Sequence, residues 1–456
     1  MPKLADKRVL VVGLGRSGIA AAALCAARGA RVTVTDKRPA AELGSMAAKL
    51  PAGVAHELGG HRRETFLSAD LIVLSPGVPE IAELAAARAA GVEITGELEL
   101  ASCFVAGTIV GITGTNGKST TTTLVGEMLR ATGRPTFVGG NLGEPLAEAV
   151  GTPAAEPGGF CVVEVSSFQL ETVVTFHPHV AVLLNITPDH LDRYDGLDGY
   201  AAAKARIFAA QTPGDFAVVN FDDPLAVRAS AAGRARREGF SIAETLATGA
   251  WLGGPLLLRL PGQPPESYPA DLPWLLGQRH NQANALAALL AARLCGASPA
   301  EARAGLLAFR ALAHRMELVA ETDGVAYYDD SKGTNVGAVV AALEGFPRPV
   351  ILIAGGRDKG GDYAPLAEAL GRVGRAAILI GEAAEKMQAA FRGVLPVERA
   401  PTLEAAVETA RRLARSGDAV VLSPACSSFD MFRDYAHRAE VFRSAVARLG
   451  GREAAR

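Results

Sequence analysis

The chain has 456 residues, enough for about three domains at roughly 150 residues per domain. Hydrophobic residues make up 49% and charged residues 21%, a globular composition that excludes a disordered chain. The net charge of −2 argues against a protein that coats nucleic acid or adsorbs to membranes, and no run approaches the roughly 18 apolar residues of a membrane span. Five scattered cysteines without a Cys-x-x-Cys pair, and a strand-like run from Arg8, predict a reduced, cytoplasmic protein without a signal peptide.

The first predicted block, residues 1–101, alternates strands with helices. Residues 9–12 form an apolar strand, residues 13–18 a Gly-rich turn before an Ala-rich helix, and residues 32–35 and 71–74 further strands. Strands that alternate with helices form a parallel sheet covered by helices. We therefore expect a Rossmann-like N-terminal domain.

The Gly-rich turn of this block is Gly13-Leu-Gly15-Arg-Ser-Gly18, and Asp36 ends the next predicted strand. Glycines at this spacing let a helix N-terminus approach a pyrophosphate group. NAD(P) or FAD, another nucleotide diphosphate, and a purely structural turn remain three alternatives on the evidence of this block.

The second predicted block, residues 102–311, contains a central parallel sheet. Its expected strands are residues 108–112, 160–164, 180–184 and 217–219. Residues 231–270 are dense in Gly and Pro, match no motif, and are expected to form short strands and loops on the flank. An Ala/Leu-rich helix over residues 281–295 follows.

A phosphate loop follows the first strand of the second block. The segment reads Gly114-Thr115-Asn116-Gly117-Lys118-Ser119-Thr120 and leads into a helix. In such a loop, backbone amides hold phosphates, a lysine meets the terminal phosphates, and a serine binds Mg²⁺. Ile112 stands where the usual spacing requires glycine, so the segment is a variant P-loop and predicts ATP and Mg²⁺ as cofactors.

Three further residues of this block are candidates for the metal site. Glu164 ends an apolar strand, where a carboxylate is costly unless it is paired, binds a metal or caps a helix. His190 follows another strand, but its position alone favours a core histidine over a metal ligand. The spacing around Lys204 alone predicts a solvent-exposed lysine on a helix.

The third predicted block, residues 312–456, has expected strands at 325–328, 350–353, 376–380 and 419–422, typical of a C-terminal Rossmann-like α/β domain. Polar segments end three of them, at residues 329–335, 355–360 and 423–428, and should meet at one edge of the sheet. Only 9 of the 46 basic residues are lysines, and two of them, Lys332 and Lys359, lie in these segments. This edge is therefore predicted to bind carboxylates.

An ATP loop, a second nucleotide-diphosphate loop and a carboxylate-binding edge together favour a ligase. ATP would phosphorylate a carboxylate, and an amine would then attack the acyl phosphate. Five segments resemble the Mur ligase family, whose shortened P-loop is also found in folylpolyglutamate synthetases: residues 114–119, 163–170, 185–194, 330–335 and 422–428. The last four are similar to the family member that adds D-glutamate to UDP-N-acetylmuramoyl-L-alanine.

The resemblance implies roles that spacing does not. Glu164 and His190 would hold Mg²⁺ together with Ser119 of the P-loop, and Lys204 is similar to a family lysine that is carbamylated to carry a magnesium ion. The implied catalytic set is Lys118, Glu164, His190, Lys204 and Lys332. The resemblance also implies contacts to ATP by Asn281, Arg315 and Asp330; to the UDP precursor by Gly15, Arg16, Ser17, Lys37, Arg38, Ser75, Asn141 and Ser166; and to D-glutamate by Lys332, Thr334, Lys359, Ser428 and Tyr435.

The expected partners are the UDP precursor and D-glutamate, with no nucleic acid and no membrane, for a chain that acts as a monomer. Another Mur ligase or a ligase of the folylpolyglutamate synthetase type is the nearest alternative. An NAD-dependent oxidoreductase, motivated by the first Gly-rich turn, and a nucleotide-sensing scaffold without turnover are alternatives from other classes.

Overall fold

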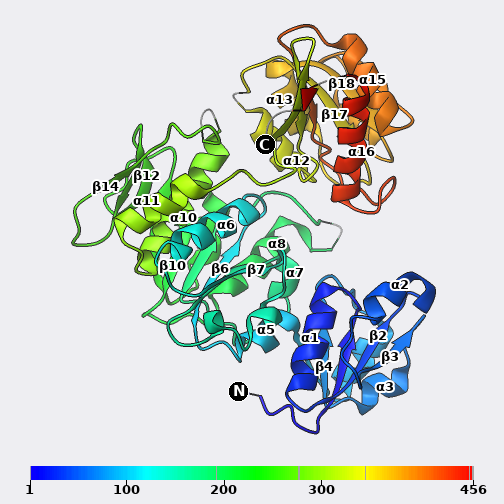
Figure 1. Ribbon diagram of the computed structural model, residues 1–456, viewed down its shortest axis with the longest axis vertical. Coiled ribbons are helices and arrows are strands. Elements are labelled where there is room, and N and C mark those ends of the chain that lie inside the picture. The colour runs from blue at the N-terminus through cyan, green and yellow to red at the C-terminus, as the bar shows by residue number, and fades with distance from the viewer. Residues whose placement is uncertain (1, 192, 276–277, 345, 451, 454–456) are drawn as a thin grey trace. The chain divides into compact units, whose positions relative to one another are not determined.

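The computed structural model describes all residues except 1, 192, 276–277, 345, 451 and 454–456. The chain forms two compact units. The first unit contains Met1–Ile186, Ala201–Tyr268 and Asn284–Phe309, and the second contains Thr187–Tyr200, Pro269–Ala283 and Arg310–Arg456. Three sheets, each with helices packed against it, make up the mixed α/β fold (Figure 1).

The N-terminal sheet is parallel throughout and has the strand order β3-β2-β1-β4-β5. Its order reverses between β1 and β4, and ligands bind at such a switch point in open α/β sheets. The predicted Rossmann-like domain is confirmed. Its elements are β1 Arg8–Val12, α1 Arg16–Ala27, β2 Arg31–Asp36, α2 Ala40–Ala47, β3 Ala55–Leu58, α3 Arg63–Ser68, β4 Leu71–Leu74, α4 Ala82–Ala89 and β5 Glu93–Gly96.

The central sheet has nine strands in the order β14-β13-β12-β11-β10-β9-β6-β8-β7. The residues 231–270 that matched no motif supply four of them, β11 to β14, at one edge. The strands are β6 Thr108–Thr113, β7 Thr136–Gly140, β8 Phe160–Glu164, β9 Val180–Leu183, β10 Phe216–Asn220, β11 Arg236–Ser241, β12 Gly249–Leu252, β13 Leu256–Arg259 and β14 Glu266–Tyr268. The helices of this part of the chain are α5 Glu97–Ser102, α6 Lys118–Arg130, α7 Ser167–Leu170, α8 Gly196–Ala205, α9 Pro224–Ser230, α10 Arg279–Leu294 and α11 Pro299–Ala308.

Helix α5 joins the N-terminal sheet to the central one within the first unit. The Glu99 carboxylate accepts hydrogen bonds from the amides of Val174, Thr175 and Phe176, at 2.7–3.0 Å. Glu97 accepts one from the Ala147 amide at 2.7 Å, and burial raises the pKa of Glu97 to about 7. Two acidic residues on one short helix thus bind loops of the neighbouring sheet.

The C-terminal sheet has the order β19-β18-β17-β20-β16-β15-β21, and separate apolar clusters cover its two faces. Neighbouring strands β17, β20 and β16 run parallel, so their carboxyl ends share one edge, as predicted. The elements are β15 Glu317–Thr322, β16 Val325–Asp329, α12 Val336–Leu343, β17 Val350–Gly355, α13 Ala364–Val373, β18 Gly374–Ile380, α14 Ala384–Ala390, β19 Val397–Arg399, α15 Leu403–Leu413, β20 Ala419–Leu422, α16 Tyr435–Arg448 and β21 Arg452–Glu453. Across the described residues, no helix combines the length and apolar character needed to cross a membrane.

Candidate functional site

The P-loop lies between β6 and α6; Asn185 is hydrogen-bonded to it and Asn284 lies against it. The Asn185 side chain accepts a hydrogen bond from the Asn116 amide at 2.8 Å and donates one to the Asn116 carbonyl at 3.1 Å. Gly117 has φ +86°, and a Cβ there would lie 2.1 Å from the Asn284 side-chain oxygen. Only glycine fits at this position, which leaves the backbone of the turn open to a phosphate.

Two lysine ammonium groups meet at one backbone oxygen of the P-loop. Lys118 Nζ donates to the carbonyl oxygens of Gly114 at 2.9 Å and Thr115 at 2.8 Å. Lys204 Nζ donates to the same Gly114 oxygen at 2.8 Å, from a side chain that is 1% exposed. The expectation from spacing that Lys204 is solvent-exposed is therefore wrong, because α8 packs this face against the P-loop.

The predicted metal ligands Ser119 and Glu164 are in direct contact. Ser119 Oγ donates to Glu164 Oε2 at 2.6 Å, and Asn141 Nδ2 donates to Glu164 Oε1 at 2.8 Å. The Glu164 side chain is buried at the carboxyl end of β8, next to β6. A hydroxyl and a carboxylate are oxygen ligands of the kind Mg²⁺ prefers, so these residues fit the ion.

The N-terminal Gly-rich turn is closely packed at the β1–β4 switch point. A Cβ on Gly18 would lie 2.0 Å from the Gly13 carbonyl oxygen, and Ser75 Oγ donates to that oxygen at 2.8 Å. Gly15, Arg16 and Ser17 begin α1 at this turn. Of the residues predicted to bind the UDP precursor, these and Ser75 therefore lie together.

The Asp36 carboxylate is paired with nearby groups of the protein itself. It accepts hydrogen bonds from the Leu14 amide at 2.8 Å and from Arg38 Nε at 3.0 Å and Nη2 at 2.8 Å. Burial raises the pKa of Asp36, but these hydrogen bonds outweigh it and lower the pKa to about 2. Lys37 and Arg38 themselves are exposed.

Asn141 and Ser166, which are also predicted to bind the UDP precursor, follow strands β7 and β8 of the central sheet. Asn141 contacts Glu164 in the central sheet. Ser166 is the N-cap of α7 and forms a capping box with Gln169. Asn281 donates hydrogen bonds to the Trp274 carbonyl and the Gln278 side chain, whereas Asn284, one turn further along α10, is the residue beside the P-loop.

At the C-terminal sheet edge, Asp330 is buried beside Ser423. Ser423 Oγ donates to the Asp330 carboxylate, and the Met316 amide donates to it at 3.3 Å. Burial raises the pKa of Asp330 to about 7, against the opposing effects of the Ser423 hydrogen bond and the Arg315 charge. Arg315 and Asp330, both predicted to contact ATP, are therefore electrostatically coupled.

The two lysines of this edge occupy different surroundings. Lys332 Nζ lies 3.3 Å from the Tyr435 hydroxyl and 4.6 Å from the centre of the Tyr435 ring, a cation–π contact. Lys359 Nζ forms an ion pair with the Asp189 carboxylate at 3.3 Å. A cavity of about 300 Å³ is lined by Asp189, Lys359, Thr334, Asn335 and Tyr363, among others, while Ser428 is buried in the loop after β20.

His190 belongs to the second unit, in the segment Thr187–Tyr200. Its φ of +54° is unusual for a residue other than glycine, and its amide donates to the Asp189 side chain at 3.0 Å. Its ring lies 6.5 Å from the ring of Tyr200. The role of His190 as a metal ligand stays a prediction.

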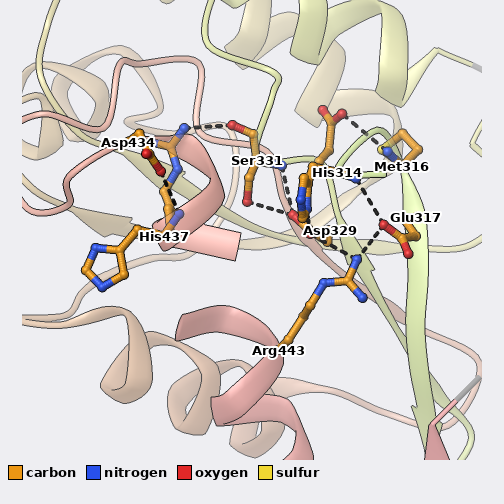
Figure 2. A network of polar contacts seen from close by, with 10 residues as sticks. His314, Met316, Glu317, Asp329, Ser331, Asp434, His437 and Arg443 are labelled. Atoms are coloured by element: carbon orange, nitrogen blue, oxygen red, sulfur yellow. Dashed lines mark hydrogen bonds and ion pairs between the residues drawn. The ribbon is translucent and has the colours of Figure 1, made fainter. Parts of the chain in front are cut away.

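The buried carboxylate of Asp329, at the end of β16, organises a polar network that sequence reasoning missed. Figure 2 shows His314, Ser331 and Arg443 directed toward Asp329. His314 Nδ1 lies 2.7 Å and Arg443 Nη2 3.4 Å from Asp329 Oδ2. Burial raises the pKa of Asp329, but the bonds to His314 and Ser331 outweigh it and hold the pKa below its usual value.

The same network contains a group with metal-ligand spacing, namely His314, Glu317 and Asp329. Arg443 forms ion pairs with both carboxylates of this group. A guanidinium already supplies the positive charge that a metal ion would bring, so we interpret the group as an ion-pair network. Asp329 and Arg443 matched no motif; the adjacent acidic pair Asp329-Asp330 at a strand end was the available signal.

Three family models match the chain in order. The Mur ligase MurD-like N-terminal domain matches residues 7–96, the Mur ligase middle domain residues 112–292, and the Mur ligase glutamate ligase domain residues 314–426. The P-loop from Gly114 and the strand edge with Lys332 and Lys359 fall inside the second and third matches.

Relatives named UDP-N-acetylmuramoylalanine--D-glutamate ligase are similar over nearly the whole chain. The protein from Geotalea daltonii is 49% identical over 454 residues, covering 98% of this chain and 99% of the relative. The protein from Anaeromyxobacter dehalogenans is 49% identical over 455 residues, covering 97% and 98%.

Solved structures share the fold at lower sequence identity. The pseudomurein peptide ligase type C from Methanothermus fervidus has a TM-score of 0.63 and 19% identity, covering 97% of this chain and all of its own. MurF ligase from Thermotoga maritima in complex with ADP has a TM-score of 0.59 and 16% identity, covering 98% and 100%. The family models and the close relatives together establish that the chain belongs to the Mur ligase family.

Proposed function

We propose that this protein joins D-glutamate to UDP-N-acetylmuramoyl-L-alanine in an ATP-dependent step of peptidoglycan precursor synthesis. The observation that carries the proposal is the near-full-length similarity to relatives named for this reaction. Two features support the proposal. The P-loop, with Lys118 in it and Lys204 of α8 against it, and the buried Ser119–Glu164 pair suit ATP. The strand edge with Lys332 and Lys359 suits a carboxylate substrate.

The first chemical step is phosphoryl transfer. An oxygen of the precursor carboxylate attacks the γ-phosphorus of ATP, the bond to the β,γ-bridging oxygen breaks, and ADP leaves. Lys118 would turn from the Gly114 and Thr115 carbonyls to the terminal phosphates, where its charge stabilises the developing negative charge. The amide groups at the start of α6 would bind the phosphate oxygens.

Ser119 and Glu164 would hold Mg²⁺, and His190 and Lys204 stay predicted ligands. When bound, the ion would neutralise charge on the phosphates. Carbamylation of Lys204 would convert its ammonium group into an anionic oxygen ligand. It would also remove one of the two positively charged groups that donate to the Gly114 carbonyl oxygen.

The second step forms the amide bond. The amine of D-glutamate attacks the acyl carbon, the bond to phosphate breaks, and the nitrogen loses a proton. Lys332, Thr334, Lys359, Ser428 and Tyr435 would hold the incoming amino acid. Lys359 already pairs with the carboxylate of Asp189, which supports its use as a carboxylate ligand.

We assign residues 1–101 to the UDP precursor, residues 102–311 to ATP and residues 312–456 to the amino acid. The half-buried, closely packed turn at Gly13 suits a diphosphate, and the bonds that Leu14 and Arg38 make to Asp36 occupy the carboxylate that a dinucleotide ribose would use. The cytoplasmic location and the monomeric state stay predictions.

A phosphate-release assay with every combination of nucleotide precursor and amino acid tests the proposal. We expect release to require ATP, UDP-N-acetylmuramoyl-L-alanine and D-glutamate together. Release with a folate substrate and L-glutamate would move the protein to the synthetase branch, and release with another UDP-muramoyl precursor would move it to another Mur ligase. Tight binding of NAD(P) by calorimetry without phosphate release would instead support the oxidoreductase.

A further inference from the structure

Arg438 is a fully buried arginine on α16, and none of the predicted roles uses it. Its Nη2 donates to the Ser331 carbonyl at 2.8 Å, and its Nη1 donates to the Cys426 carbonyl at 3.4 Å. Burial lowers the pKa of Arg438 to about 10, because removal from water disfavours the charged guanidinium. An apolar side chain would leave the Ser331 and Cys426 carbonyls without these donors, so the guanidinium contributes hydrogen bonds as well as packing.

The two carbonyl groups belong to two loops, which we name the β16 loop (residues 330–335) and the β20 loop (residues 423–428). These loops also bind each other, because the Ala425 amide donates to the Gly333 carbonyl at 2.8 Å. A Cβ on Gly333 would lie 2.4 Å from Asp330 Oδ2 and 2.7 Å from Ser423 Oγ. The two loops are therefore tightly packed, and a small displacement of one loop would also displace the other.

Hydrogen bonds to Asp329 and from Arg438 hold Ser331 in place. Its amide and hydroxyl donate to Asp329 Oδ1 at 3.0 and 2.6 Å, while its carbonyl accepts from Arg438. Lys332 is the next residue in the chain. Tyr435, one turn before Arg438 on α16, contacts the Lys332 ammonium group. Helix α16 therefore holds Lys332 through its side chain and through the backbone that precedes it.

We infer that Arg438 is a positioning residue for D-glutamate, which sets the β16 and β20 loops in register so that Lys332, Thr334 and Ser428 bind the amino acid together. The inference rests on the proposed function. A guanidinium suits the task because its planar, rigid group donates to two separate carbonyls in fixed directions, whereas a lysine ammonium group is compact and sits on a flexible chain without that fixed geometry. Arg438 acts through the backbone and does not itself contact the substrate.

The test compares R438K and R438M with R448M, a control at the exposed end of the same helix. KM for D-glutamate, KM for ATP, kcat and thermal stability are measured for each. We expect R438K to raise KM for D-glutamate about tenfold and R438M further, because a tenfold effect needs only a small loss of alignment. KM for ATP should rise less, because Asp330, the predicted ATP contact in the β16 loop, is also held by the Met316 amide outside both loops. R448M should match the parent protein.

Equal increases in KM for all substrates, or an unchanged KM for D-glutamate in a folded R438K, overturn the inference. If both variants at position 438 fail to fold, Arg438 is a core-stability residue, which also overturns it. Failure of the proposed function is separate, since the parent protein would then show no D-glutamate-dependent phosphate release at all.

Discussion

Lys118 and Lys204 donate to the same carbonyl oxygen of Gly114, although 86 residues separate them in the chain. Two ammonium groups this close repel each other. An anionic phosphate at the P-loop would be attracted by both groups, which agrees with the phosphate binding proposed for Lys118. Carbamylation of Lys204 stays a separate prediction.

Replacing Lys118 by alanine should lower kcat at least about 100-fold, the scale for removing one group that stabilises charge in a transition state. Steady-state phosphate release measures it. K49A, at an exposed lysine, is the matched control and should keep full activity. Near-normal turnover of K118A would contradict the P-loop assignment.

Replacing Lys204 by alanine should reduce activity, and added short carboxylic acids such as acetate should restore part of it by supplying the missing anionic oxygen. The measurement is kcat against acetate concentration, with K118A as the variant that acetate should not restore. Full activity of K204A, with no response of the parent protein to high bicarbonate, would eliminate the carbamate.

At the scale of elements, strand–turn–helix units place the chemistry. In both the N-terminal and central sheets, a buried apolar strand ends at a glycine turn, and a helix starts within a few residues. The turn backbone must approach its neighbours more closely than a side chain allows, as at Gly18 and Gly117. Apolar strand, glycine turn and helix start are all local patterns, which explains why the sequence predicted these units well.

Substituting Gly117 by alanine should weaken ATP binding, because the new Cβ would lie 2.1 Å from the Asn284 side-chain oxygen and force this side chain beside the P-loop to move. Isothermal calorimetry with a non-hydrolysable ATP analogue measures it. G133A is the control, since Gly133 also has positive φ (+74°) but open space around it. Both variants should lose about 1–2 kcal/mol of stability from the strained backbone. Equal ATP affinities for the two variants would contradict the prediction.

The contacts of Asp36 with the Leu14 amide and with Arg38 should make stability depend on pH. Its pKa is about 2 when folded and 3.8 in the reference state, so its stabilising effect is complete above about pH 4 and is lost as pH falls toward 2. D36N should therefore cost about 1–2 kcal/mol at pH 7 and less at pH 3. Urea unfolding at both pH values measures it, with exposed D271N as control. A pH-independent cost would show that the Asp36 charge contributes nothing.

For the whole molecule, two compact units with their own apolar clusters should unfold in separate transitions. A non-hydrolysable ATP analogue at 100 times its dissociation constant should stabilise the P-loop unit by about 2.7 kcal/mol. Differential scanning calorimetry should detect an upward shift of that transition, and K118A should reduce the shift. A single cooperative transition that the analogue leaves unchanged would contradict this prediction.

The sequence by itself determined the three α/β sheets, the two glycine turns, the edge with Lys332 and Lys359, and the family, because each depends on local periodicity or a contiguous motif. Only the tertiary structure decided that Lys204 is buried, that Asn185 is hydrogen-bonded to the P-loop with Asn284 beside it, and that Arg438 joins two loops. These contacts link residues far apart in the chain: Lys204 and Gly114 are separated by 90 positions in the sequence, and Arg438 and Ser331 by 107. No local pattern encodes such a pairing, because it arises only when packed elements bring distant side chains to the same backbone group.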